Sequence, residues 1–187
     1  MSIETWPPGS ATYKVSGWLG SGTFGAVFMA RRLSLHDSRS CSVAVKVIPR
    51  YSFGSSRELE VMQILREQPH VAVMQLIECF SVASTEGSKA RILTCLVLPL
   101  FDSCLRTYLD QPEHAAEHSD AEARLLRLQR IGMQLSSALA HVHSLRIIHR
   151  DLSACCARTE APSRSQVLCS CCLTRPCHSL HAALRRA

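Results

Sequence analysis

The chain has 187 residues, 47% of them apolar, and its net charge is +6. That length and composition suit one domain with a buried core and exclude a chain that is disordered over most of its length. Residues 157–187 hold five of the 21 basic side chains and one of the 15 acidic ones. Most of the positive excess therefore lies near the end and gives little support for a nucleic-acid partner.

No run approaches the roughly twenty apolar residues that cross a bilayer. Residues 1–9 have neither the basic nor the apolar part of a secretory signal, so we expect no secretion and no membrane span. Four cysteines are scattered through apparent strands and a helix start, as reduced thiols of a cytosolic chain are: Cys41, Cys79, Cys95 and Cys104. The sequence thus predicts a cytoplasmic protein, with the nucleus as the alternative.

A polar leader, residues 1–12, contains Pro7-Pro8-Gly9 and is expected to form a flexible arm. Residues 33–40 predict a polar loop, and residues 85–89 predict a turn. Five segments predict strands: 13–19, 26–32, 41–48, 71–80 and 92–98.

Helical periodicity appears in three places. A helix opening at Ser55 carries three apolar residues that would face the sheet: Leu59, Met62 and Leu65. Residues 101–110 predict a short helix, and residues 112–119 predict a polar insertion. Residues 120–144 predict the strongest helix, with one apolar stripe: Leu128, Ile131, Leu135, Leu139 and Val142. After Cys156 the periodicity stops, and no helix or strand is expected before residues 178–186.

Gly20, Gly22 and Gly25 form the pattern G-x-G-x-x-G, which Val27 extends to G-x-G-x-x-G-x-V. A backbone without Cβ atoms can turn tightly and approach a polyphosphate, with its amides pointing at phosphate oxygens. Alone, the pattern also fits a glycine hairpin or a dinucleotide site. No acid lies near position 45, where a dinucleotide site needs one; Lys46 stands there, inside an apolar strand.

Two further motifs follow in order: Val43-Ala44-Val45-Lys46 and, behind an amphipathic helix, His149-Arg150-Asp151-Leu152. With the glycine pattern they resemble the signature set of a eukaryotic protein kinase domain. The resemblance covers residues 13–154. It implies an α+β fold: a five-stranded antiparallel N-lobe sheet with one helix, joined to an incomplete helical C-lobe.

The implied domain organisation follows the motifs. Residues 13–98 would form the N-lobe, and residues 99–156 the hinge and a partial C-lobe that ends in the catalytic loop. Residues 157–187, rich in Cys, Arg and Ser, resemble no kinase segment and are expected to be poorly ordered. On this interpretation the kinase domain is truncated after the His-Arg-Asp motif.

The resemblance assigns catalytic roles to Lys46, Glu58 and Asp151. Lys46 would contact the α- and β-phosphates and pair with Glu58, while Asp151 would accept the proton of a substrate hydroxyl. The short spacing from Lys46 to Glu58 resembles shaggy-type glycogen synthase kinases of the cyclin-dependent and MAP kinase group. Two alternatives stay open: Glu58 as part of a capping box with Ser55, and Glu60 as the paired acid.

The resemblance also implies which residues bind ATP. The glycine turn and its flanks would enclose the phosphates, Val27 and Ala44 would pack on the adenine faces, and Leu98 would guard the adenine pocket. Pro99 and Phe101 would offer hinge backbone groups to the adenine edge. The full set is Leu19, Gly20, Ser21, Gly22, Thr23, Phe24, Gly25, Val27, Ala44, Lys46, Leu98, Pro99 and Phe101.

The kinase pattern fails after Asp151. The family places a magnesium-binding asparagine where this chain has Cys156, and a thiol is a poor ligand for Mg²⁺. No Asp-Phe-Gly or Ala-Pro-Glu follows within the 187 residues. Mg²⁺ is thus expected for the family, but its ligands are missing here, and we assign no metal-binding residue. Ser153 stands where Ser/Thr kinases have a lysine, which leaves a tyrosine acceptor open.

The sequence therefore predicts a protein kinase that transfers the ATP γ-phosphate to protein Ser or Thr hydroxyls, in a form that is weak or inactive. The alternative is a nucleotide-binding pseudokinase or regulatory fragment that acts through a protein partner. A third interpretation rests on the tail, where zinc or a binding partner would engage the cysteines and histidine: Cys169, Cys171, Cys172, Cys177 and His178.

Overall fold

The computed structural model describes residues 11–22, 25–34, 41–49, 55–84, 91–110, 121–149, 152–153, 157–159 and 167–169. The chain divides into two compact units, the first made of residues 1–63 with 75–100 and the second of residues 64–74 with 101–187. Residues 1–10 of the predicted arm (residues 1–12), Asp151, Cys156 and the tail from residue 170 lie outside the described residues, whereas residues 11–12 begin the first strand and not an arm.

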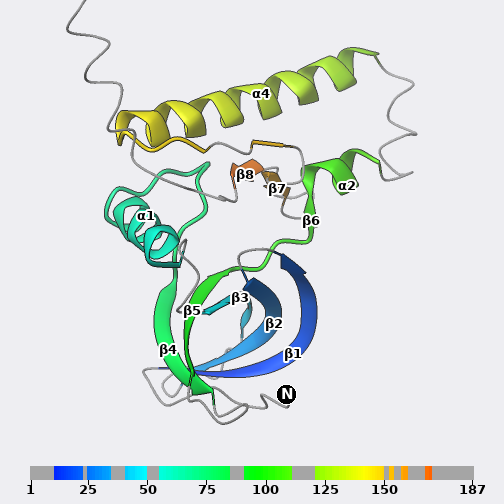
Figure 1. Ribbon diagram of the computed structural model, residues 1–187. Coiled ribbons are helices and arrows are strands. Elements are labelled where there is room, and N and C mark those ends of the chain that lie inside the picture. The colour runs from blue at the N-terminus through cyan, green and yellow to red at the C-terminus, as the bar shows by residue number, and fades with distance from the viewer. Residues whose placement is uncertain are drawn as a thin grey trace, which may run out of the picture. The chain divides into compact units, whose positions relative to one another are not determined.

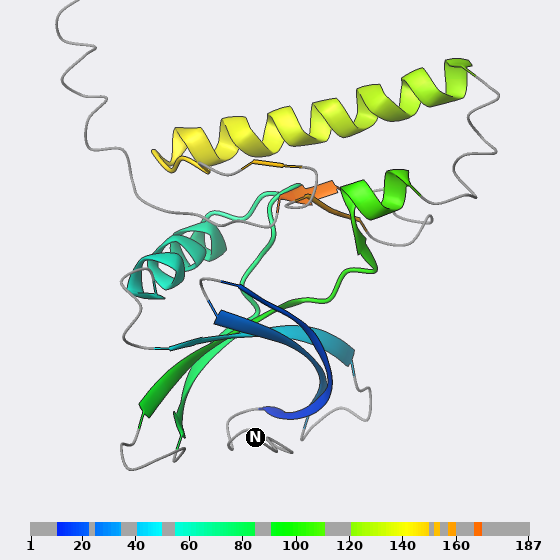
Figure 2. The ribbon, with the colours of Figure 1, turned by 45° about the vertical axis from the view of Figure 1, so that its right-hand side comes forward.

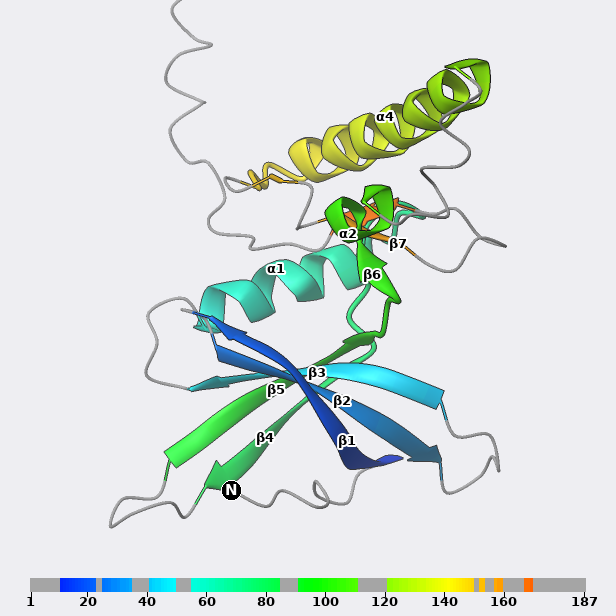
Figure 3. The ribbon, with the colours of Figure 1, turned by 90° about the vertical axis from the view of Figure 1, so that its right-hand side faces the viewer.

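The first unit contains a five-stranded antiparallel sheet (Figure 1). In sheet order the strands are β1 (Ala11–Gly22), β2 (Gly25–Ser34), β3 (Cys41–Pro49), β5 (Arg91–Pro99) and β4 (Glu78–Ser84). Figure 3 shows the twist that the strands share. The predicted α+β fold with this sheet is confirmed.

Period-two alternation on β3 gives the sheet two distinct faces. Val43, Val45 and Val47 point to one face and are at most 9% exposed, whereas Ala44 and Lys46 point to the other face. The first face carries a continuous apolar core, whose buried members are Tyr13, Ala30, Val43, Val45, Val47, Cys95 and Val97. Burial raises the pKa of the Cys95 thiol to about 12, so this side chain behaves as a small apolar residue.

The sheet curls so far that its two edge strands, β1 and β4, touch (Figure 1). The ring of Tyr13 on β1 stacks on Phe80 of β4, with ring centroids 5.5 Å apart. The Tyr13 hydroxyl donates a 2.7 Å hydrogen bond to Glu78 Oε2, and Arg32 lies 3.8 Å from the same oxygen. Burial and this hydrogen bond raise the pKa of Tyr13. One buried phenol thereby closes the sheet on itself.

Helix α1 spans Ser55–Glu67 and buries Val61, Met62 and Leu65, while Leu59 is half-buried. The predicted strand over residues 71–80 is wrong in its first part, because β4 begins only at Glu78. Ala72, Val73 and Met74 are all buried in succession, which a two-faced strand does not allow.

The second unit holds β6 (Ser103–Cys104), α2 (Leu105–Leu109), α4 (Ala121–Ser144), β7 (Ala157–Thr159) and β8 (Val167–Cys169). The three short strands pair in the order β6-β7-β8. The expectation of no strand before residue 178 is therefore wrong, because β7 and β8 find hydrogen-bonding partners in β6 and in each other. Leu105 is the buried centre of a small core with Tyr108, Leu109, Ile131 and Leu135.

Helix α4 is one continuous helix of 24 residues (Figure 2). Its predicted apolar stripe holds from Ile131 to Val142, but Leu128 is 47% exposed. Among the described residues, no helix is long and apolar enough to span a membrane.

The end of α4 is fixed by a hydrogen-bonded cap. The N–H of Ile147 donates to the carbonyl of Val142, and that of Arg146 donates to His143. Arg146 has φ 60°, the left-handed conformation that such a cap requires and that glycine usually supplies. Ile147 and Val142, each 1% exposed, supply the apolar contact of the cap. The chain leaves this cap toward His149, which is 3% exposed.

Candidate functional site

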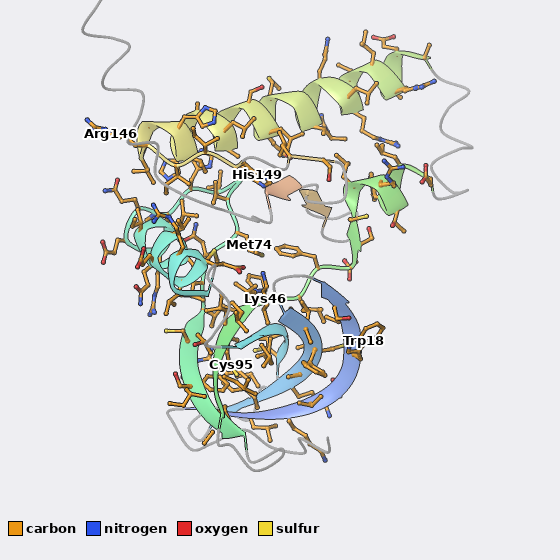
Figure 4. All side chains as sticks on the ribbon, viewed as in Figure 1. Trp18, Lys46, Met74, Cys95, Arg146 and His149 are labelled. Atoms are coloured by element: carbon orange, nitrogen blue, oxygen red, sulfur yellow. The ribbon has the colours of Figure 1, made fainter. Side chains whose placement is uncertain are left out.

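The site is centred on an ion pair between β3 and α1. Lys46 Nζ lies 2.6 Å from Glu58 Oε1 and 2.8 Å from Oε2, so both carboxylate oxygens accept from the ammonium. The two side chains are only 14% and 12% exposed. Figure 4 labels Lys46 on the first unit. A lysine within an apolar strand is thus paired with an anion inside the protein rather than extended into solvent.

The geometry distinguishes between the two acids that the sequence offered. Residues two apart on a helix point in directions about 200° different, and Glu60 is exposed where Glu58 faces Lys46. Because the ammonium contacts both oxygens of Glu58, this carboxylate is used in the ion pair rather than at its own helix start. The catalytic roles of Lys46 and Glu58 remain predictions.

The glycine turn lies next to this site in the sheet. Val27, two residues after Gly25, is the cross-strand neighbour of Lys46. Strands β1 and β2 stay paired as far as Gly22 and Gly25. At Gly25 φ is 124°, and a Cβ there would overlap the backbone carbonyl oxygen of Val47. This position therefore requires glycine, whereas a Cβ on Gly20 would meet no atom within 4 Å.

The other residues that were predicted to bind the nucleotide differ in their exposure and in the unit to which they belong. Leu19 and Ser21 are exposed on β1. Thr23 and Phe24 lie outside the described residues. Phe101 is half-buried and belongs to the second unit.

Strand register places the predicted adenine-facing residues on the face of Lys46. Ala44 lies two residues before Lys46 and opposite Leu98 of β5, and Leu98 is 8% exposed. Pro99 pairs with Val43 and so belongs to the opposite face. Met29, opposite Ala44, shares the face of Lys46 but was not among the predicted residues. Its position two residues after Val27 on one strand was the signal that would have found it.

The predicted catalytic aspartate, Asp151, lies outside the described residues, as do Arg150 and Cys156. The described flanks are the buried His149, labelled in Figure 4, and the exposed Leu152 and Ser153. Within the described residues no group of three or more His, Cys, Asp or Glu side chains is placed to hold a metal ion. The candidate zinc ligands of the tail fall outside the residues whose side chains are described.

A second polar cluster, which the sequence did not reveal, lies in the second unit. The rings of His70 and His141 stack with centroids 4.9 Å apart. His70 Nδ1 accepts the N–H of Ala72 at 3.1 Å, so its other nitrogen carries the proton and donates to Ser137 Oγ at 3.1 Å. Desolvation first, and then the neighbouring His141, lower the pKa of His70. The contacts join residues 67 positions apart, beyond the reach of local sequence patterns.

A curled antiparallel sheet with a glycine turn and a lysine–glutamate pair defines the nucleotide-binding half of a kinase domain. The family model for protein tyrosine and serine/threonine kinases matches residues 13–157. The chain belongs to the protein kinase family.

Similar curated proteins include kinases from viruses, fungi and animals, several of them named as serine/threonine kinases. The chain is 30% identical to serine/threonine-protein kinase US3 of Human herpesvirus 2 over 78% of its own length and 27% of that protein. It is 33% identical to sucrose non-fermenting protein kinase 1 of Fusarium virguliforme, over 75% and 18%. It is 30% identical to probable cyclin-dependent kinase 9 of Caenorhabditis elegans, over 77% and 29%. The matches thus span less than a third of each of these relatives.

Proposed function

We propose that the chain binds ATP through its first unit and that, in its 187-residue form, it transfers phosphate to protein Ser or Thr hydroxyls weakly or not at all. The observation that carries the binding half of the proposal is the ion pair of Lys46 with Glu58. Members of the family use this pair to position a lysine on the ATP phosphates. The serine/threonine kinases among the relatives favour those acceptors over tyrosine.

The first unit supplies the chemistry that ATP needs. The Lys46 ammonium is held by a carboxylate on the face of the sheet beside the strand that follows the glycine turn. Gly20 offers open backbone on which a phosphate can approach, and Ala44, Val27 and Leu98 offer an apolar surface to a base on the same face. These residues fit a nucleoside polyphosphate.

The residues present do not fit Mg²⁺. The ion takes oxygen ligands, whereas the position five residues after Asp151 is Cys156. No Asp-Phe-Gly occurs among these residues to supply a carboxylate. Stabilisation of the transferred phosphoryl group by the metal supplies much of the rate in this reaction. Asp151 can orient a hydroxyl, but the charge that develops on the phosphoryl oxygens lacks its usual counter-ion.

The poor fit of these residues to Mg²⁺ favours a second function, a pseudokinase that binds nucleotide and acts through a protein partner. Binding and transfer then separate, because binding depends on residues of the first unit, whereas transfer depends on Asp151 and the positions that follow it. A reducing compartment, cytoplasm or nucleus, suits four described cysteines that form no disulfide: Cys41, Cys79, Cys95 and Cys104.

The test combines thermal unfolding with a phosphotransfer assay on the purified chain. ATP at 100 times its Kd stabilises a protein by about 2.7 kcal/mol, which for a chain of this size raises Tm by about 5–10 °C. We expect that shift, together with transfer to a generic protein substrate no greater than in Lys46→Ala and Asp151→Asn variants. These variants also reveal contaminating kinases. A chain that ATP does not stabilise overturns the binding proposal, and wild-type transfer that Lys46→Ala or Asp151→Asn abolishes overturns the prediction of inactivity.

A further inference from the structure

The outer strip of α4 is a solvent-facing surface that helix packing within the described chain does not use. It comprises nine exposed residues: Glu122, Leu125, Leu126, Gln129, Gly132, Met133, Ser136, Ala140 and His143. Leu125, Leu126 and Met133 are 55%, 51% and 66% exposed. A helix that is apolar on the face opposite its core contact is normally covered on both sides.

The strip contains a glycine that its own unit does not explain. Gly132 lies in the middle of α4, where glycine costs about 1 kcal/mol relative to alanine. A Cβ on Gly132 would meet no atom within 4 Å, so no contact with the described residues requires its absence. A glycine inside a helix usually has a packing or functional reason. Close approach of another helix is such a reason.

We propose that the outer strip binds the same strip of a second copy of this chain, with the two α4 helices antiparallel and crossing near Gly132. A two-fold axis at this point places Gly132 of one copy against Met133 of its partner, and the same contact recurs on the other side of the axis. The long methionine side chain then fills the space that the glycine leaves, and the helix backbones can approach closely.

Two further pairs of facing positions are complementary in size or polarity under this one register. Leu125 meets Ala140, so a large side chain again faces a small one. Gln129 meets Ser136, and the amide and hydroxyl can exchange hydrogen bonds. Leu125 and Leu126 lie in the first half of the strip, whereas Ser136 and Ala140 lie in the second half, which suits an antiparallel pair and not a parallel one.

The ionisable residues of the strip are also complementary under this register. Glu122 near the start of the strip meets His143 near its end, where the ring can donate an N–H to the carboxylate in either protonation state. A parallel pair would instead bring the two glutamates together. The three arginines of the helix, Arg124, Arg127 and Arg130, lie outside the strip, so no cation is buried by the pairing. Complementary size and charge at these four pairs of facing positions commit the strip to a second copy rather than to an unrelated protein.

The first experiment is sedimentation of the full chain over a concentration series. We expect a monomer–dimer equilibrium that Met133→Glu shifts to monomer, weakening association at least about tenfold. Arg130→Glu is the matched control, because it introduces the same side chain at an exposed position of α4 outside the strip, and it should associate as the wild type does. A wild-type chain that stays monomeric throughout the series overturns the proposal.

The second experiment separates association from folding. Gly132→Leu should raise the helix stability of the monomer, because leucine has the higher helix propensity, while it blocks the close approach of two helices. We therefore expect an unchanged or higher Tm at dilute concentration together with loss of the dimer. If Gly132→Leu leaves association unchanged, the proposed crossing point is wrong.

The register is tested by cysteine cross-linking, read by mass spectrometry so that the native cysteines are distinguished. Gly132→Cys lies at the axis and should link two copies at position 132. Leu125→Cys is the control, because the two positions 125 of a dimer would lie about 22 Å apart along the helices at 1.5 Å per residue. Linkage of position 125 to itself would indicate parallel helices and overturn the antiparallel arrangement.

Discussion

The two units of the chain bury their side chains to different degrees. In the first unit the buried phenol of Tyr13 joins the sheet edges, and Lys46 meets its carboxylate at 2.6 Å. In the second unit α4 buries Ala138 and Val142 but leaves Leu125, Leu126, Leu128 and Met133 about half exposed. The comparison indicates that the proposed nucleotide site lies on a well-packed sheet. The parts of a kinase that complete phosphotransfer would have to build on a helix whose apolar surface is only partly covered.

The largest effect is expected at Gly25, where a side chain would both overlap Val47 and occupy φ 124°. Gly25→Ala should lower the free energy of unfolding of the first unit by about 2–4 kcal/mol, from strain and overpacking together. Chemical denaturation measures it. Gly17→Ala is the control, because its Cβ would meet only the side chain of Met29, whose Cε lies 3.4 Å away, and no backbone atom. Equal losses in the free energy of unfolding at the two positions would contradict the claim that position 25 requires glycine and position 17 does not.

The second largest effect is expected at the hydrogen bond that joins the two edge strands of the curled sheet. Tyr13→Phe removes the hydroxyl that donates to Glu78 at 2.7 Å and should cost about 1.5–3 kcal/mol, the range for a hydrogen bond to a charged group. A double-mutant cycle with Glu78→Gln isolates this contact from other effects of either change. Strictly additive costs would mean that the bond does not hold the edge strands together.

In the second unit a substitution should stabilise. Arg146 occupies the left-handed conformation at φ 60°, which costs a residue with a Cβ roughly 1–2 kcal/mol. Arg146→Gly should therefore raise the stability of the second unit by up to about 1 kcal/mol. The gain is limited because glycine loses more conformational entropy on folding than arginine does. Thermal unfolding measures it. Arg146→Ala keeps the Cβ and should give no gain, so a gain with alanine would assign the effect to the arginine side chain instead.

The smallest effect is the pH dependence of the histidine pair. The pKa of His70 is lowered in the folded state, so the unfolded chain binds more protons and acid favours unfolding. This contribution is present in full above about pH 6.5, the ordinary value, and is lost as pH falls through the lowered pKa of the folded state. Because the ring is only partly buried, solvent screening keeps the effect modest.

His141→Phe tests the same pair from its other side. It retains the stacked ring but removes the neighbouring imidazole that contributes to the lowered pKa of His70. Stability measured between pH 5 and 8 should then depend less on pH than in the wild type. A steeper dependence in the variant would contradict the direction assigned to His70.

Local patterns predicted most elements of the first unit, whereas the five-stranded sheet and the Lys46–Glu58 ion pair were predicted from the resemblance to the kinase family. Alternation on residues 41–48 reports a two-faced strand, and glycine spacing reports a tight turn. The choice between Glu58 and Glu60 required the direction in which α1 points each carboxylate. Residues 71–77 were misread because a buried run that folds as a turn shows the same apolar composition as a buried strand.

Contacts between distant residues were beyond the sequence altogether. Tyr13 and Glu78 are 65 positions apart, and nothing in the residues around either one indicates that the sheet closes between them. The same holds for His70 and Ser137. The short strands β7 and β8 lack any periodicity and exist because β7 pairs with β6 and β8 pairs with β7, so they too could not be predicted.

The most direct test of the central claim is calorimetric titration of ATP into three forms of the full chain: wild type, Lys46→Met and Lys14→Met. Lys14 is the exposed lysine of β1 in the same sheet, so its variant removes an equal charge away from Glu58. We predict similar affinities for wild type and Lys14→Met, and a loss of at least about tenfold, or 1.4 kcal/mol, in Lys46→Met. Equal binding by all three forms, or no binding by a folded wild type, would contradict the account.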